Sequence, residues 1–124
     1  MPRRRWAPPH QACVRELVQV RQRLSSDGIE LLAKFEFQCD LILRIGEAQN
    51  EVRFGSLRVF RVSSFNAALY TFYAVATPGS FVLLHAWVTR CKPGTPAVKY
   101  HTAYWPCPPP QACRDQATSR LESR

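Results

Sequence analysis

The sequence predicts one small α+β domain, and three observations carry this prediction. The chain has 124 residues, close to the usual size of a single domain. Hydrophobic residues make up 46% of it, which is enough for a core. Apolar residues recur at helical spacing in the first third of the chain, and three strand-like runs follow. We therefore expect a two-helix hairpin packed on a small antiparallel β-sheet.

Two amphipathic helices are expected before Gly46. Apolar side chains recur at three- and four-residue steps from Gln11 to Leu24, and again from about Ile29 to Ile45. The stretch "SSDG" separates the two segments with capping and turn residues, and Gly46 supplies a C-terminal cap. Phe37 and Leu41 lie off the apolar stripe of the second helix, so they face either a second element or a partner.

The strand-like runs are "VRFGSLRVFRV", "ALYTFYAVA" and "SFVLLHAWV", separated by short turn-like segments. This order predicts an antiparallel meander. Within "RVFRV" the alternation places Val59 and Arg61 on one face of the sheet and Phe60 on the other.

Both ends of the chain look irregular. Residues 1–10 combine three arginines with three prolines and are expected to form a mobile basic arm. The segment "YWPCPPPQAC" carries prolines that exclude central strands and a long helix. We therefore expect the domain to span residues 11–103, and residues 104–124 to form an irregular or disordered tail.

Charge and cysteine usage narrow the class of protein. Seventeen Lys and Arg against nine Asp and Glu give a net charge of +8. This balance suggests a polyanionic partner, either nucleic acid or a strongly acidic protein, although many basic domains bind nothing anionic.

The five cysteines lack the spacing of a zinc site, so no metal is expected, and Cys13 and Cys39 fall within apolar helical patterns. No apolar run approaches the roughly 18 residues of a membrane span, and no signal peptide is visible, so we expect a cytoplasmic protein.

The segment "LYTFYAVATPGSFVLLHAWVTRCKPGTP" resembles the RelE-like toxin superfamily, in particular the phage-derived HigB group of toxin–antitoxin systems. The family pattern has an aromatic strand, a strand ending in Leu-Leu-His-aromatic, two basic residues and a Thr-Pro. Here the second part of this pattern is Leu83 to Trp87, followed by Arg90, Lys92 and Thr95. The resemblance covers roughly residues 14–103, because the helical half and "LRVFRV" also match in type.

This resemblance implies a RelE-like fold and an endoribonuclease that cleaves mRNA, typically on the ribosome, without a metal or cofactor. It also implies a cognate antitoxin of the helix-turn-helix type as a partner. Cleavage through the RNA 2′-hydroxyl requires a proton acceptor, cations for the charged phosphorane, and an acid for the leaving oxygen. The residues expected to be catalytic are Arg61, Tyr73, Arg90 and Lys92, and those expected to bind RNA are Arg58, Lys99 and His101.

The sequence departs from the family pattern where the chemistry is expected. Val59 replaces the family's acidic residue, Thr71 replaces an arginine, and Thr89 replaces one of two lysines. The alternative is therefore a catalytically weakened or inactive toxin-fold protein that binds RNA or antitoxin without cleavage. A third reading is that the likeness is due to chance.

The candidate residues have structural explanations as well. His85 is expected to be a packed core residue, Tyr73 fits the core and the site equally, and Arg90 and Lys92 fit solvated turn positions.

Overall fold

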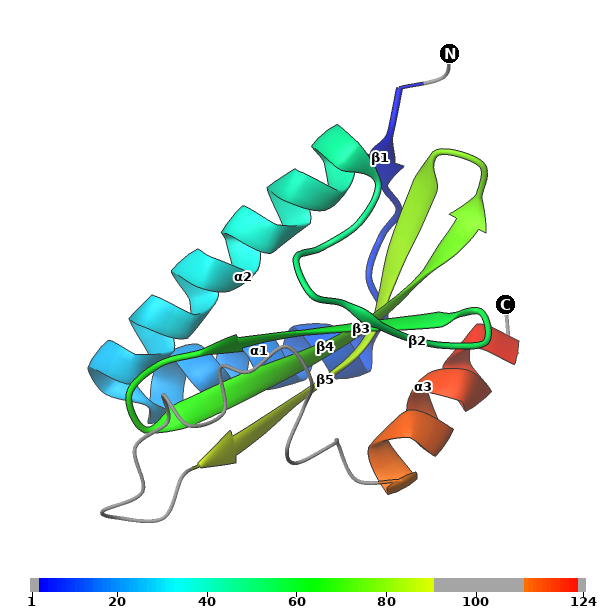
Figure 1. Cartoon of the computed structure of the whole chain (residues 1–124). Helices are drawn as coiled ribbons and strands as arrows, with labels where there is room; N and C mark the ends of the chain where they lie inside the picture. The colour runs from blue at the N-terminus through cyan, green and yellow to red at the C-terminus, as the bar shows by residue number, and fades with distance from the viewer. Residues whose placement is uncertain (1–2, 91–110, 123–124) are drawn as a thin grey trace.

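The computed structural model describes residues 3–90 and 111–122, and these residues form an α+β structure, as the sequence predicts (Figure 1). The elements are β1 (Arg5–Trp6), α1 (Gln11–Arg23), α2 (Ser25–Ile45), β2 (Val52–Phe54), β3 (Leu57–Ser63), β4 (Ala67–Thr77), β5 (Ser80–Arg90) and α3 (Gln111–Glu122). Among these residues, none of the helices combines the length and the apolar character that a membrane crossing requires.

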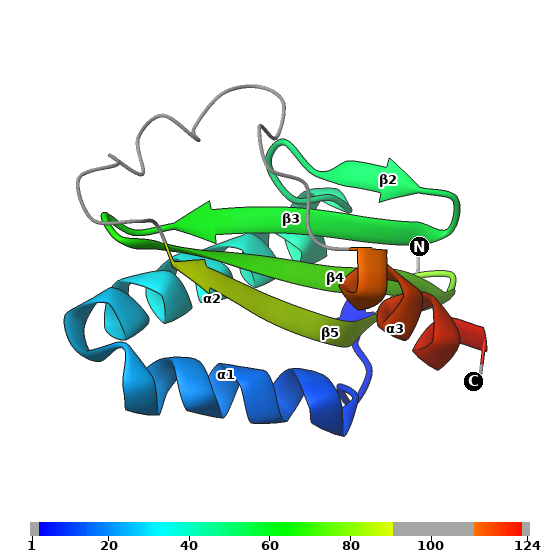
Figure 2. The same ribbon diagram turned by 90° about the horizontal axis from the view of Figure 1, so that it is seen from below.

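The two predicted helices pack side by side on one face of the sheet (Figures 1 and 2). Only Leu24 separates α1 from α2, so "SSDG" is the first turn of α2 and not a separate loop. Gly28 allows this close approach, because a Cβ at this position would lie 2.4 Å from the carbonyl oxygen of Val20. Gly46 ends α2 with φ of 90°, as its position predicts.

The sheet has the strand order β1-β5-β4-β3-β2. The predicted antiparallel meander is present as β3, β4 and β5. The first predicted run is in fact a hairpin, in which β2 and β3 are joined at Gly55, and the short β1 adds a parallel pair with β5. The meander prediction therefore missed two strands.

Each face of the sheet has its own apolar cluster. One cluster joins the face under α1 and α2 to those helices and includes Phe35, Phe60 and Tyr73. The other lies on the opposite face, against α3, and includes Phe72, Leu84 and Ala117. The sheet is thus covered by helices on both faces, with α3 on the face opposite to the α1–α2 pair (Figure 2).

The prediction of a mobile arm at residues 1–10 is wrong for the part that is described. The Arg5 amide donates to the Gly79 carbonyl at 2.8 Å, and the Ala7 amide donates to the Phe81 carbonyl at 2.7 Å. The Trp6 ring packs against Tyr73 and Phe81, with ring centroids 5.8 and 5.7 Å apart. Burial of this ring fixes a segment whose prolines and charges suggested mobility.

The prediction of an irregular tail is also wrong where the structure describes it. Residues 111–122 form α3, which buries Ala117 against the sheet. The prolines of "CPPP" end at residue 110, so they exclude a helix before that point but not after it.

Candidate nucleic-acid interface

Two of the predicted site residues, Arg58 and Tyr73, belong to a polar network around Glu51. They are direct neighbours on β3 and β4, and the Arg58 guanidinium lies 6.0 Å from the centre of the Tyr73 ring. The Tyr73 hydroxyl donates to the Glu51 carboxylate, which also accepts from the Ala48 amide at 2.9 Å and from Arg53 at 3.0 Å. Arg58 completes the network by donating to the Gly46 carbonyl at 3.0 Å.

This network is structural. Tyr73 is fully buried, and the Glu51 side chain is only 4% exposed. Burial, and then the hydrogen bond to Glu51, raise the pKa of the Tyr73 phenol above its usual value. Tyr73 therefore serves the core and holds the segment between α2 and β2, and it offers no exposed acid to a substrate.

Arg61 lies on the opposite face of the sheet from Tyr73. Its neighbours Phe60 and Val62 both point to the α1–α2 side, so alternation turns Arg61 to the other face, as the sequence predicts, and this is the face that α3 covers. There it opposes Tyr70, whose ring packs against Trp87 at 5.2 Å. The sheet consequently separates Arg61 from Tyr73.

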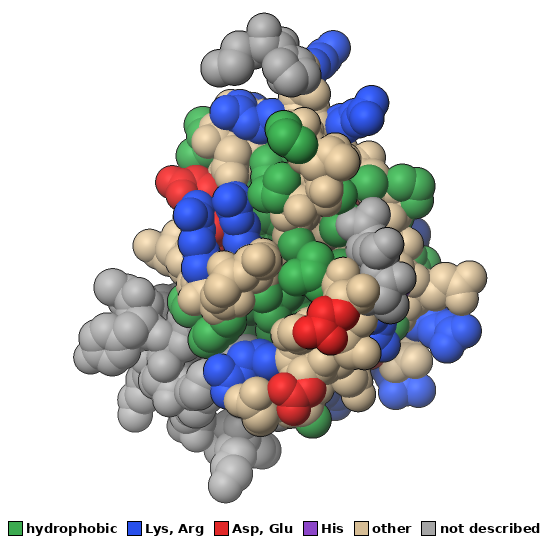
Figure 3. Space-filling view, turned by 90° about the vertical axis from the view of Figure 1, so that its right-hand side faces the viewer, with side chains coloured by type: hydrophobic (Ala, Val, Ile, Leu, Met, Phe, Trp, Pro, Cys, Tyr) green, Lys and Arg blue, Asp and Glu red, His purple; other side chains and the backbone are tan. Residues whose placement is uncertain are grey.

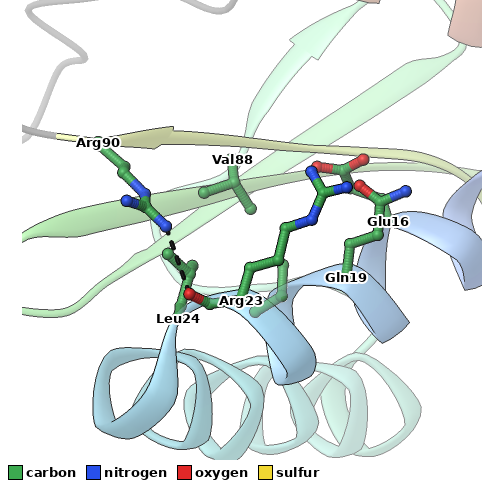
Figure 4. Close-up of a pocket in the computed structure, with 7 residues that line it drawn as sticks. Glu16, Gln19, Arg23, Leu24, Val88 and Arg90 are labelled. Carbon is green, nitrogen blue, oxygen red and sulfur yellow. Dashed lines mark hydrogen bonds between the residues drawn. The ribbon is translucent and has the colours of Figure 1, made fainter.

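Arg90 lies at the end of β5, at the rim of the sheet (Figure 4). Its guanidinium donates to the Arg23 carbonyl at the end of α1, at 3.4 Å. Arg23 and Arg90 line two adjoining grooves of about 330 and 510 Å³. Glu16 lines the first groove and Asp27 the second, so the two carboxylates offset the two guanidinium groups. Among the described residues that line this open rim, the positive and negative side chains are therefore equal in number.

The remaining predicted site residues, Lys92, Lys99 and His101, lie outside the described residues. His85, for which a packed position is predicted, lies against the Phe72 ring at 5.9 Å. Burial, and then the charge of Arg120, lower the pKa of its imidazole. His85 is therefore a neutral packing residue near pH 7.

A further groove, lined by three arginines, lies at the N-terminal arm. It has a volume of about 620 Å³ between the arm, the end of α2 and the β4–β5 turn. No carboxylate lines it, and its lining consists of Arg3, Arg4, Arg5, Trp6, Leu43, Pro78 and Gly79. We call it the arginine groove. Figure 3 shows Lys and Arg side chains beside hydrophobic ones at this end of the molecule.

The three arginines of this groove have different roles. Arg4 donates to the Arg44 carbonyl at 2.8 Å and approaches the Leu43 carbonyl at 3.5 Å, so it caps the C-terminal end of α2. Arg3 and Arg5 are exposed. From the sequence, the site was predicted on β3, β4 and the end of β5. The sequence signal for the arginine groove was the run of three arginines before a tryptophan.

The described residues contain no group of three or more His, Cys, Asp and Glu side chains that could hold a metal ion. None of the protein-family models, curated proteins or solved structures compared with this chain matches it. Function is therefore inferred from the side chains themselves.

Proposed function

We propose that this chain is a toxin-like protein, on a RelE-like scaffold of the HigB type, that binds RNA without cleaving it. The observation that carries the proposal is the arginine groove, because it is lined by three guanidinium groups and no carboxylate. The order of a helix hairpin followed by an antiparallel meander agrees with the scaffold that the sequence resemblance implies.

Arg3 and Arg5 are suited to a phosphate backbone. A guanidinium donates two parallel hydrogen bonds to a phosphate, and its charge displaces condensed counterions from the nucleic acid. Both side chains are exposed, whereas Arg4 is held by the end of α2 and orders the segment. A fixed strand with two free cations therefore forms a contact site for single-stranded RNA.

The described part of the predicted catalytic set argues for binding and against cleavage. Cleavage needs an acid, a base and cations around one phosphate. Arg61 and Tyr73 lie on opposite faces of the sheet, and the Tyr73 hydroxyl is held by Glu51. Arg90 contacts Arg23 on the helix side, so it does not share a face with Arg61. These groups cannot act on the same phosphate in this arrangement.

Binding and cleavage of a labelled single-stranded RNA test the proposal directly. We expect the wild-type protein to bind the RNA and to leave it intact, both alone and in a reconstituted translation reaction. The variant Arg3→Ala/Arg5→Ala is expected to bind at least about tenfold more weakly, and Arg23→Ala/Arg90→Ala, which removes the same number of arginines at the rim, to bind normally. Weaker binding by the rim variant alone would place the RNA at β5 instead.

Endoribonuclease activity is the second candidate, and Arg61 is the residue that favours it. Its Nη1 atom is buried and has no hydrogen-bond partner among the described residues. A buried guanidinium nitrogen without an acceptor is unfavourable unless an anion arrives. Specific cuts in mRNA that disappear in Arg61→Ala, with RNA binding preserved, would establish this activity and overturn the non-cleaving proposal.

A further inference from the structure

The outer side of the α1–α2 hairpin exposes several large apolar side chains. On α1, Val14 and Val18 are 41% and 47% exposed, and on α2, Ile29 and Phe37 are 69% and 55% exposed. The apolar residues that these helices bury, among them Val20, Leu31 and Phe35, belong to the cluster on the sheet side. No other described element lies on the outer side of the two helices (Figure 2). We call this surface the hairpin face.

The charges on the hairpin face are divided between the two helices. The exposed charged residues of α1 are Arg15, Arg21 and Arg23, all cationic. On α2, Glu30, Glu36 and Asp40 are exposed. Lys34 and Arg44 pair with Glu30 and Asp40, whereas Glu36 has no ion pair within the described residues. One helix is thus basic and its neighbour carries an unpaired carboxylate.

The helices run antiparallel, and their contacts fix which residues lie at the same level. Gly28 of α2 lies against Val20 of α1, and Cys39 lies close enough to Cys13 for the two thiols to interact electrostatically. Between these two points, Arg15 is level with the turn of α2 that contains Glu36. Arg21 is level with the first turn of α2, about one turn before Glu30.

We propose that the hairpin face binds a second copy of this chain. A two-fold axis along the mean direction of the two inclined helices places α1 of each copy over α2 of the other, running in the opposite sense and at about the same level along the axis (Figure 1). Arg15 of one copy then lies beside Glu36 of the other, and Arg21 lies near Glu30. Val14 packs near Phe37, and Val18 packs near Ile29. Each of these contacts forms twice, which makes the surface complementary to itself.

This occupant fits the face better than RNA does. The carboxylates of α2 repel a phosphate backbone, whereas the basic α1 of a second copy complements them. An exposed aromatic ring between opposite charges is typical of the centre of a protein interface with a polar rim.

Sedimentation of the full-length, nucleic-acid-free protein over a range of concentrations tests the proposal. The wild-type chain is expected to shift reversibly from monomer to dimer mass. Arg15→Glu and Glu36→Arg are each expected to weaken the dimer at least about tenfold, because like charges then face each other twice. Combining the two changes restores the pairing, so the double variant is expected to dimerise about as well as the wild type. Phe37→Ser removes the apolar centre and is expected to remain monomeric.

Arg3→Glu is the control, since it makes the same change of charge on another surface and is expected to leave the dimer intact. Circular dichroism shows whether each variant is folded, and the double variant distinguishes a lost interface from lost structure. A wild-type chain that stays monomeric at every concentration would overturn the proposal. A dimer that tolerates both single charge reversals would also overturn it, because it would use another face. The outcome does not depend on the RNA-binding proposal, as no nucleic acid is present.

Discussion

Glu51 is a residue on which several polar contacts converge. Its carboxylate accepts from the Tyr73 hydroxyl, the Ala48 amide and Arg53, and it lies 4.0 Å from Arg58. Together, these contacts attach the segment that follows α2 to the middle of β4. The same contacts keep the Tyr73 hydroxyl inside the fold, so a structural role fits Tyr73 better than the predicted catalytic one, whereas the Arg58 side chain remains 20% exposed.

Replacing Glu51 should therefore destabilise the fold. Glu51→Ala leaves the Tyr73 hydroxyl without its buried acceptor and removes the carboxylate that lies 4.0 Å from Arg58, and we expect the free energy of unfolding to fall by about 2–4 kcal/mol. Urea denaturation measures this change. Glu47→Ala is the control, because the Glu47–Arg53 pair is largely exposed, and its loss should cost less than about 1 kcal/mol. Equal effects of the two substitutions would show that the network contributes nothing special.

Cys13 and Cys39 predict how stability depends on pH in the alkaline range. Burial raises the pKa of each thiol from 9.0 to about 12. The native state thus retains these protons at pH values where the unfolded chain has lost them. Stability from this source is complete below pH 9 and should be lost progressively as the pH rises toward 12.

Urea denaturation at a series of pH values checks this expectation, and Cys13→Ala/Cys39→Ala should reduce the slope between pH 9 and 12. Because the thiolate is the reactive form, both thiols should also resist alkylation in the native protein at pH 8, with mass spectrometry reporting each cysteine. Rapid modification of Cys13 without unfolding would show that this site is open to solvent.

At the level of the elements, Gly28 sets the distance between α1 and α2. Alanine is the better helix former, so Gly28→Ala would stabilise an isolated helix. In this fold the new Cβ would lie 2.4 Å from the Val20 carbonyl oxygen, and the two helices would have to separate. We expect a net loss of about 1–3 kcal/mol in the free energy of unfolding, measured by thermal or urea denaturation. Ser26→Ala, at an exposed position in the same turn, should change stability by less than about 0.5 kcal/mol; a stabilised Gly28→Ala variant would mean that the helices can move apart freely.

The elements that could be predicted from the sequence are those with a strong local pattern. The two long helices and the meander follow from apolar periodicity, and Gly46 marks the end of α2 as its residue type suggests. β1 has only two residues, and the partly buried Trp6 anchors it by packing on Tyr73 and Phe81, a tertiary contact that no local pattern reveals. For α3 the signal was present but weak, since Cys113, Ala117 and Leu121 recur at four-residue steps in an otherwise polar segment.

The candidate site was less predictable than the fold. The exposed position of Arg90 at the end of β5 follows from its place after an apolar run. The separation of Arg61 from Tyr73 depends on how β3 and β4 are paired, and one residue of register would reverse the face of either side chain. The arginine groove could not be predicted from the sequence, because it forms only when the arm pairs with β5 beside the turn at Gly79.

Across the whole molecule, the positive charge is unevenly distributed. The net charge is +8, but the rim at Arg90 is offset by Glu16 and Asp27, and α2 carries several exposed acids. Among the three grooves described above, the arginine groove is the one whose charged side chains are all cationic. The two proposals thus place RNA and a second copy of the chain on different surfaces, so each can be tested without the other.

The salt dependence of RNA binding tests the central claim most directly. Affinity for a single-stranded RNA should be measured at several salt concentrations for the wild-type protein and for Arg3→Ala/Arg5→Ala, with the RNA inspected for cuts at the end of each titration. Each phosphate contact contributes about 0.7 to the slope of log affinity against log salt, so loss of two contacts should lower the slope by about 1.4, and the RNA should remain intact. An unchanged slope in the variant would show that RNA binds elsewhere, and cleaved RNA would contradict the account of a binding protein that does not cut.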